Sequence, residues 1–333
     1  GRYGGVLRAP MKYVGAKTFD INSNANTPTG GNAAAEWDAT TGVFAANPDG
    51  RTLSGTNATF GVSGVINYLN KFGRTGPVAG RYKVYDPVSE LYYESLRYLQ
   101  GLQPSEDAVS KMTTAMYDGY PVFTTWSDPY GDGRTSSSNY ACLKSNIVVI
   151  GDINTHDGDY RFPKPDPALN HPNVDDWTKT VIAFEKGTAK EYLDGQGKKR
   201  ETKGNPAPNA DVRTHSIIGH SYWAHTHDIR GTDWTAQPSM QRPGLRVKSF
   251  FFDVNEHGNQ KDANTRRNRN QFFTAAKYGG FESDPSNPGR KPLTPSATPS
   301  SARTARPMTT SGRTAPGPAR PAPTICKAVP AAC

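Results

Sequence analysis

Residues 145–159 read Ser-Asn-Ile-Val-Val-Ile-Gly-Asp-Ile-Asn-Thr-His-Asp-Gly-Asp, and this stretch decides the expected fold. The four apolar residues from Ile147 to Ile150 follow one another without a polar break. A short β-branched run of this kind predicts a strand buried on both faces, as inside a parallel sheet. The strand ends at Gly151, and the loop behind it offers polar side chains at Asp152, Asn154, His156, Asp157 and Asp159.

Two interpretations of this loop remain open from the residues alone. Ligands of α/β folds bind beyond the carboxyl ends of central strands, and hard cations such as Mg²⁺ and Ca²⁺ prefer oxygen ligands there. Asp152 would then lie at a binding edge of the sheet. A solvated turn after a core strand would contain the same residue types.

The strongest helix pattern begins at Asp86 and Pro87 and runs to Gly101. Asp is a good N-cap, Pro suits the first helical position, and an acidic residue in the first turn favours the helix dipole. Glu90 occupies that first turn, and Glu94 lies one helical turn further along. This pair indicates support for the helix surface rather than an acid and base.

Helix and strand patterns alternate along the rest of the chain. Helical spacing occurs at residues 63–73, 111–117, 175–185, 216–227 and 270–278, and strand patterns occur at residues 1–15, 121–126 and 247–254. Such alternation predicts an α/β fold whose sheet is at least partly parallel.

The composition suggests one folded domain and a tail. Residues 1–284 are expected to fold, with loop-rich insertions at 20–62 and 157–212. Residues 285–333 hold 11 of the 27 prolines and no aromatic residue, so we expect a disordered tail. A proline-rich linker has this composition, but the abrupt change favours coding sequence translated out of frame.

Most of the net charge of +9 belongs to the tail. Seven of the 39 basic residues and no acidic residue follow Asp284, so residues 1–284 carry 32 basic and 30 acidic groups. A nucleic-acid binder usually has a basic face on its folded part. The basic cluster at Arg266, Arg267 and Arg269, together with the tail, keeps nucleic-acid binding as an alternative function.

The residues make no positive case for catalysis. His220, His225 and His227 lie close in sequence, but no further ligand has a diagnostic metal spacing, so a structural or surface role is favoured. No nucleophile elbow or phosphate-binding loop is present. One enzymatic alternative remains, a secreted metal-dependent hydrolase that uses Asp152, His156 and Asp159.

No apolar run is long enough to span a membrane, and the three cysteines do not reveal the compartment. The chain begins at Gly1 without a visible signal peptide, so we expect a fragment of a longer chain.

Several strings in this sequence resemble one family closely. They are Gly4–Ala9, Ser63–Gly73, Tyr85–Glu94, Asn146–Thr155, Trp223–Arg230 and Asn270–Phe281. Together they resemble the N-terminal half of the type IV pilus tip-adhesin family (PilC/PilY) over roughly residues 1–290. The tail does not match.

The resemblance implies a von Willebrand factor A-like domain, a doubly wound sheet with a cation bound above the strand ends. The Asp-x-Ser-x-Ser loop of the family pattern would lie upstream of Gly1, so we expect an incomplete domain. The Thr of the pattern falls on Asp86, and its strand-end Asp corresponds to Asp152. With Asn154 from the same loop, these residues are the expected ligands of Mg²⁺ or Ca²⁺.

The resemblance also implies a non-enzymatic role in pilus assembly, tip adhesion and twitching motility. The expected partners are pilins, minor pilins and a host or abiotic surface, with no nucleic acid. The expected location is the pilus tip at the cell surface, after export through the bacterial outer membrane.

Overall fold

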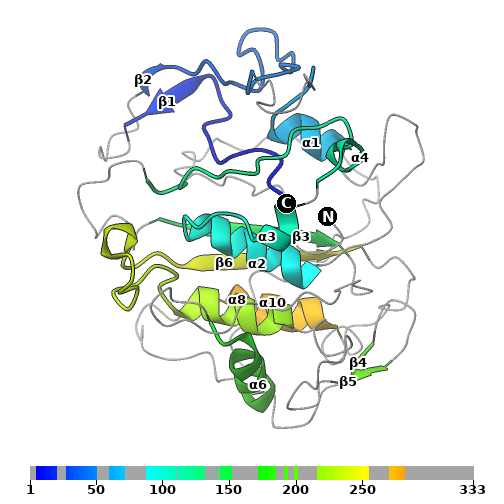
Figure 1. Cartoon of the computed structure of the whole chain (residues 1–333), viewed down its shortest axis with the longest axis vertical. Helices are drawn as coiled ribbons and strands as arrows, with labels where there is room; N and C mark the ends of the chain where they lie inside the picture. Colours follow the sequence, from blue (N-terminus) through cyan, green and yellow to red (C-terminus); the bar gives the residue numbers. More distant parts are fainter. Residues whose placement is uncertain are drawn as a thin grey trace, which may run out of the picture.

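The structure, a computed structural model, is described here for part of the chain. The described residues are 5–20, 28–50, 60–71, 88–110, 112–131, 140, 143–151, 172–184, 191–193, 199–201, 216–254 and 270–281. Their elements (Figure 1) are β1 (Lys17–Phe19), β2 (Pro28–Gly31), α1 (Val65–Lys71), α2 (Val88–Leu99), α3 (Glu106–Val109), α4 (Thr114–Tyr117), β3 (Ser145–Gly151), α6 (Val174–Phe184), β4 (Glu191–Leu193), β5 (Lys199–Glu201), α8 (Ser216–Thr226), η2 (Pro238–Met240), β6 (Val247–Asp253) and α10 (Gln271–Gly279).

A parallel pair of strands lies at the centre of the fold. β3 pairs with β6 without a bulge, from Ser145 opposite Val247 to Gly151 opposite Asp253. The expected α/β class and the expected parallel pairing are therefore confirmed. The doubly wound von Willebrand factor A-like arrangement is not, because among the described residues the sheet has these two strands alone.

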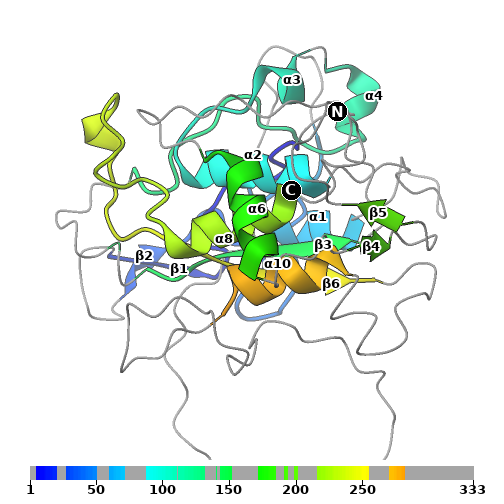
Figure 2. The same cartoon turned by 90° about the horizontal axis from the view of Figure 1, so that it is seen from below.

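Helices α8 and α10 pack together on one side of the strand pair, and α6 lies beyond them (Figure 1). Figure 2 shows α6 in front of both helices, with the strands behind. α8 is buried almost all round because it contacts α2, α6, α10 and β6. Gly219 permits the closest of these approaches, since a Cβ there would lie 2.4 Å from Thr178 Oγ1 and 2.5 Å from the Val174 carbonyl oxygen.

Helix α2 joins the same core through its tyrosines. The hydroxyl oxygen of Tyr92 lies 2.6 Å from that of Ser249 on β6, and the Tyr92 ring is stacked with the rings of His220 and Phe251. α2 follows the expected helix closely and ends before Gly101, whose positive φ of 72° suits a glycine after a helix.

The expectation that Glu90 and Glu94 lie on the helix surface is wrong. Both are buried, at 1% and 2% exposure. Glu94 Oε2 accepts a hydrogen bond from the Ser105 backbone N–H at 3.1 Å, and burial raises the pKa of this carboxyl. Their spacing along α2 could not reveal this, because a pair one turn apart occurs on buried and exposed faces alike.

The expectation that β3 is buried on both faces is also wrong. Ile147 faces the helices and is 2% exposed, whereas Val148 and Ile150 point to the other side and are 37% and 48% exposed. On β6, Phe252 and Val254 are likewise exposed, at 42% and 58%. We call these four exposed side chains the outer row; none of the helices α2, α8 and α10 covers it.

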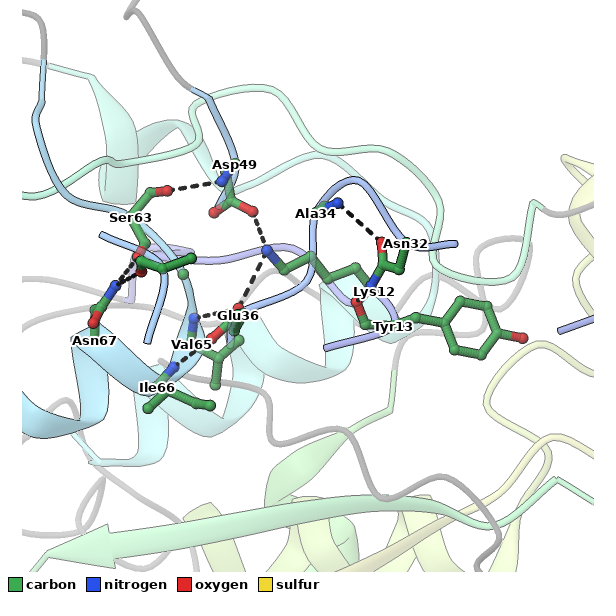
Figure 3. A network of polar contacts seen from close by, with 12 residues as sticks. Lys12, Tyr13, Asn32, Ala34, Glu36, Asp49, Ser63, Val65, Ile66 and Asn67 are labelled. Atoms are coloured by element: carbon green, nitrogen blue, oxygen red, sulfur yellow. Dashed lines mark hydrogen bonds and ion pairs between the residues drawn. The ribbon is translucent and has the colours of Figure 1, made fainter. Parts of the chain in front are cut away.

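The N-terminal part of the chain is held by a polar network (Figure 3). Glu36 is buried, and its two carboxylate oxygens accept hydrogen bonds from the Val65 and Ile66 amides at 2.8 and 2.7 Å. Its Oε1 also lies 3.2 Å from Lys12 Nζ, which pairs with Asp49 as well. A carboxylate at these amides caps the start of α1, and its negative charge interacts favourably with the positive end of the helix dipole.

Some shorter elements differ from the sequence-based expectation. Residues 121–126 form no strand but one isolated bridge, between Phe123 and Leu7. The helix expected at 111–117 is reduced to the four residues of α4. α1 buries Val65 and Tyr68 while Leu69 is exposed.

The expected domain limits stay a prediction. Residues 285–333 lie outside the described residues, as does most of the expected insertion 157–212. In the described part of the chain, no helix has the length and apolar character needed to cross a membrane.

Candidate functional site

The candidate site lies at the carboxyl edge of β3 and β6, where two helices also begin. Gly151 ends β3 and pairs with Asp253, the last residue of β6. A Cβ at Gly151 would lie 3.7 Å from Val88 Cγ2 and 3.9 Å from the Phe272 ring. The first turns of α2 and α10 therefore meet the two strand ends at one place, the position where parallel sheets present their ligand sites.

Asp253, at the end of β6, places a carboxylate at this edge. The Asn270 side-chain amide donates a hydrogen bond from Nδ2 to Asp253 Oδ2 at 2.7 Å. The same side chain caps α10, because its Oδ1 accepts a hydrogen bond from the Phe273 backbone N–H at 3.0 Å. Asn270 is buried, so its orientation is fixed and it holds the carboxylate in turn. The arrangement presents an oriented, negatively charged group beside the N-terminus of a helix.

The three predicted cation ligands, Asp152, Asp86 and Asn154, lie outside the described residues. Their described neighbours nevertheless lie side by side. Asp152 follows Gly151 in the sequence, and Asp86 precedes Val88 by two residues. Gly151 and Val88 lie close together in the structure. The predicted ligand set stays a prediction.

Sequence reasoning missed Asp253, although the rule that selected Asp152 also selects it. Both residues directly follow or end an apolar strand, and parallel strands bring their carboxyl ends to one edge. A strand at 247–254 was expected, so the carboxylate near its end could have been named as a site residue.

The described part of the chain was also searched for a cluster of metal ligands. Among the described residues, no group of three or more His, Cys, Asp or Glu side chains could hold a metal ion. His220 is 1% exposed and packs against Tyr92 and Tyr93; its burial lowers its pKa to about 3. His225 Nε2 lies 2.8 Å from the Phe281 carbonyl oxygen. The structural or surface role expected for the histidines stays a prediction.

Comparison with known proteins identifies the family. The family model described as "PilY1 homolog, second domain" matches residues 2–221, about two thirds of the chain. The chain belongs to the PilY1 homolog family. A curated relative, the type IV pilus biogenesis factor PilY1 homolog of Xylella fastidiosa (strain Temecula1), is 32% identical over an alignment of 298 residues. The alignment covers 84% of this chain and 22% of the relative.

The chain therefore spans about a fifth of the length of this PilY1 homolog. No solved structure matches the chain. The family match confirms the resemblance that the sequence strings indicated. The match lends no support to the two alternative functions, the metal-dependent hydrolase and the nucleic-acid binder. The hydrolase residues His156 and Asp159, and the basic cluster Arg266 to Arg269 of the nucleic-acid binder, lie outside the described part of the chain.

Proposed function

We propose that this chain is a part of a type IV pilus biogenesis factor and that it works by binding rather than by catalysis. The observation that carries the proposal is the family match over residues 2–221. The relative from Xylella fastidiosa is named a type IV pilus biogenesis factor, and this name supplies the process. The partners would be pilins, minor pilins and a host or abiotic surface, met at the pilus tip after export.

The binding edge would be the carboxyl edge of β3 and β6, within a von Willebrand factor A-like domain. There Asp152, Asp86 and Asn154 would hold Mg²⁺ or Ca²⁺ through oxygen ligands, as hard cations prefer. A cation that its protein ligands leave partly unsaturated can accept a carboxylate from a partner. Asp253, oriented by Asn270, adds negative charge to the same edge and favours cation binding there.

The test uses the full-length parent protein in its native bacterium. Asp152→Ala should reduce piliation, twitching motility and surface adhesion, while Asp107→Ala, which removes an exposed carboxylate on α3, should change none of them. Adhesion should be compared at equal piliation, so that a loss of pili is not counted as a loss of attachment. Unchanged piliation and adhesion in Asp152→Ala would remove the role of this edge.

The cation is tested separately by calorimetric titration of the purified full-length protein with Mg²⁺ and with Ca²⁺. Binding should weaken in Asp152→Ala and, to a smaller extent, in Asp253→Asn, because the latter removes a charge that is close to the site but is not a predicted ligand. Equal binding by the wild-type protein and Asp152→Ala would leave pilus biogenesis in place as a family function and would refute the cation at this edge.

A further inference from the structure

Lys12, Glu36 and Asp49 form a buried triad of one amine and two carboxyl groups in the N-terminal part of the chain (Figure 3). The Lys12 ammonium contacts Asp49 Oδ1 directly and lies 3.2 Å from Glu36 Oε1. The side chains of Lys12, Glu36 and Asp49 are 13%, 1% and 6% exposed. An amine is thus held against one carboxyl group, with a second carboxyl group beside it and little access for water.

Neighbouring groups hold both carboxyl groups of the triad in place. The two oxygens of Glu36 accept hydrogen bonds from backbone amides at the start of α1, which fix the orientation of this side chain. The Asp49 backbone N–H donates a hydrogen bond to Ser63 Oγ at 2.9 Å. Gly64 permits close packing here, since a Cβ on it would lie 3.0 Å from Glu36 Cδ and 2.6 Å from Pro48 Cγ. Fixed geometry of this kind removes much of the entropic barrier to a reaction between two groups.

One carboxylate oxygen of the triad has no donor. Asp49 Oδ2 is buried and accepts no hydrogen bond within the described part of the chain. A buried oxygen of this kind is costly in a site that holds an ion pair alone. The cost disappears if this oxygen leaves, because an amide made from the Asp49 carboxyl group keeps only one oxygen.

We propose that Lys12 and Asp49 become joined by an isopeptide bond, which the protein forms by itself with Glu36 as the proton carrier. A proton first passes from the Lys12 ammonium to the Asp49 carboxylate, which removes two buried charges. The neutral Lys12 nitrogen then attacks Asp49 Cγ, and the N–Cγ bond forms. Glu36 takes a proton from this nitrogen and returns it to the departing hydroxyl, so that the Cγ–O bond breaks and one water leaves. Glu36 ends as the carboxylate it was before, and no oxidant or other reactant is consumed.

The bond closes residues 12–49 into a covalent ring that contains β1 and β2. Such a cross-link restricts the unfolded chain, as a disulfide does, but reducing agents do not break it. When the chain is pulled from outside the ring, the tension passes through the bond and leaves the ring closed. The bond does not depend on the proposed role in pilus biogenesis, and it would protect any protein that carries force along its chain.

Peptide mass spectrometry of the purified full-length protein tests the bond. The protein is denatured and digested with trypsin and chymotrypsin, which cut at both ends of residues 9–13 and of residues 45–51. Trypsin does not cut after an acylated lysine, so these two peptides should appear joined and lighter than their sum by one water. Fragment spectra should place the link between Lys12 and Asp49. Absence of the joined peptide from the wild-type protein would overturn the proposal.

A loss of water alone is not sufficient evidence, because Asp49 can also cyclise onto the backbone N–H of Gly50. A protein that is lighter by one water but gives no joined peptide would overturn the proposal. Lys71 and Asp118 provide an internal control in the same digest. Lys71 Nζ lies 3.8 Å from Asp118 Oδ2 and both side chains are more exposed than the triad, so this pair should give no joined peptide.

Three variants test the part played by each group. Lys12→Arg keeps the positive charge but has no amine, and Asp49→Ala has no carboxyl group, so neither should give the joined peptide. Glu36→Gln keeps both reacting groups but lacks the proton carrier, so the bond should form about 100-fold more slowly after synthesis, as measured by pulse labelling. A joined peptide in Lys12→Arg or Asp49→Ala would overturn the assigned bond, and an unchanged rate in Glu36→Gln would overturn the role of Glu36.

Discussion

Replacing Glu36 with Ala should release the N-terminus of α1. The carboxylate accepts two hydrogen bonds from backbone amides, and Val65, the donor of one of them, is 2% exposed, so water cannot replace the lost acceptor. The substitution also removes one of the two carboxylates that face Lys12 (Figure 3).

The magnitude follows from these contacts. Removing one partner of a buried ion pair costs about 3–5 kcal/mol. Because Asp49 still pairs with Lys12, we expect the lower end, a loss of about 3 kcal/mol in the free energy of unfolding. For a chain of 333 residues, with an unfolding entropy of about 0.7 kcal/mol/K, that corresponds to a decrease of roughly 4 °C in Tm.

Urea unfolding followed by tryptophan fluorescence measures the loss. Glu36→Gln, which keeps one acceptor oxygen, should give an intermediate value. Glu106→Ala removes an exposed carboxylate of α3 and should stay within about 0.5 kcal/mol of the wild type. If Glu36→Ala were as stable as this control, the buried carboxylate would not hold α1 and the reasoning would be refuted.

Three further predictions concern the core. Gly219→Ala should lower the free energy of unfolding by about 1–3 kcal/mol, because the new Cβ would clash with Thr178 and with the backbone of α6. Gly61→Ala is the control, since a Cβ there meets open space and should leave the stability unchanged. Asn270→Ala should cost about 1–2 kcal/mol by removing the cap of α10. His220→Phe should make the fold less sensitive to acid. In the wild-type protein His220 has its ordinary pKa of 6.5 when the chain is unfolded, and burial lowers the pKa to about 3 in the folded chain. The wild-type protein therefore loses stability as the pH falls from 6.5 towards 3, and the variant should not show this loss.

Each of these has a direct measurement. Urea midpoints separate Gly219→Ala from Gly61→Ala, and equal midpoints would contradict the close helix approach. For Asn270→Ala, unchanged hydrogen exchange in the first turn of α10 would argue against the cap. Between pH 7.5 and 5, His220 should account for about 2 kcal/mol of the wild-type loss. Parallel losses in wild type and His220→Phe would show that another group is responsible.

The sequence predicted the elements better than their surroundings. Helical spacing of apolar residues identified α2 and α10, and short apolar runs identified β3 and β6. The alternation of helix and strand indicated the parallel pairing. The exposure of Val148 and Ile150 could not be read from the same pattern, because four consecutive apolar residues look alike whether or not a covering layer lies within these 333 residues.

The candidate site could likewise be predicted only as far as it depends on local sequence. A strand-end carboxylate is a local feature, so Asp152 could be selected and Asp253 could have been. The role of Asn270 depends on the approach of α10 to β6, a contact between elements that the sequence pattern does not encode. The burial of Glu90 and Glu94 depends likewise on neighbours contributed by other parts of the chain.

The parallel pairing of β3 with β6 has a consequence for biosynthesis. Every pair of partners in this ladder is 102 residues apart, as in Ser145 and Val247. At translation rates of roughly 5–20 residues per second, β3 leaves the ribosome about 5–20 s before its partner. Such high contact order slows folding, and local contacts such as those within α6 and α8 form sooner. Throughout that interval the apolar residues of β3 have no partner strand from β6 and depend on other surroundings for protection.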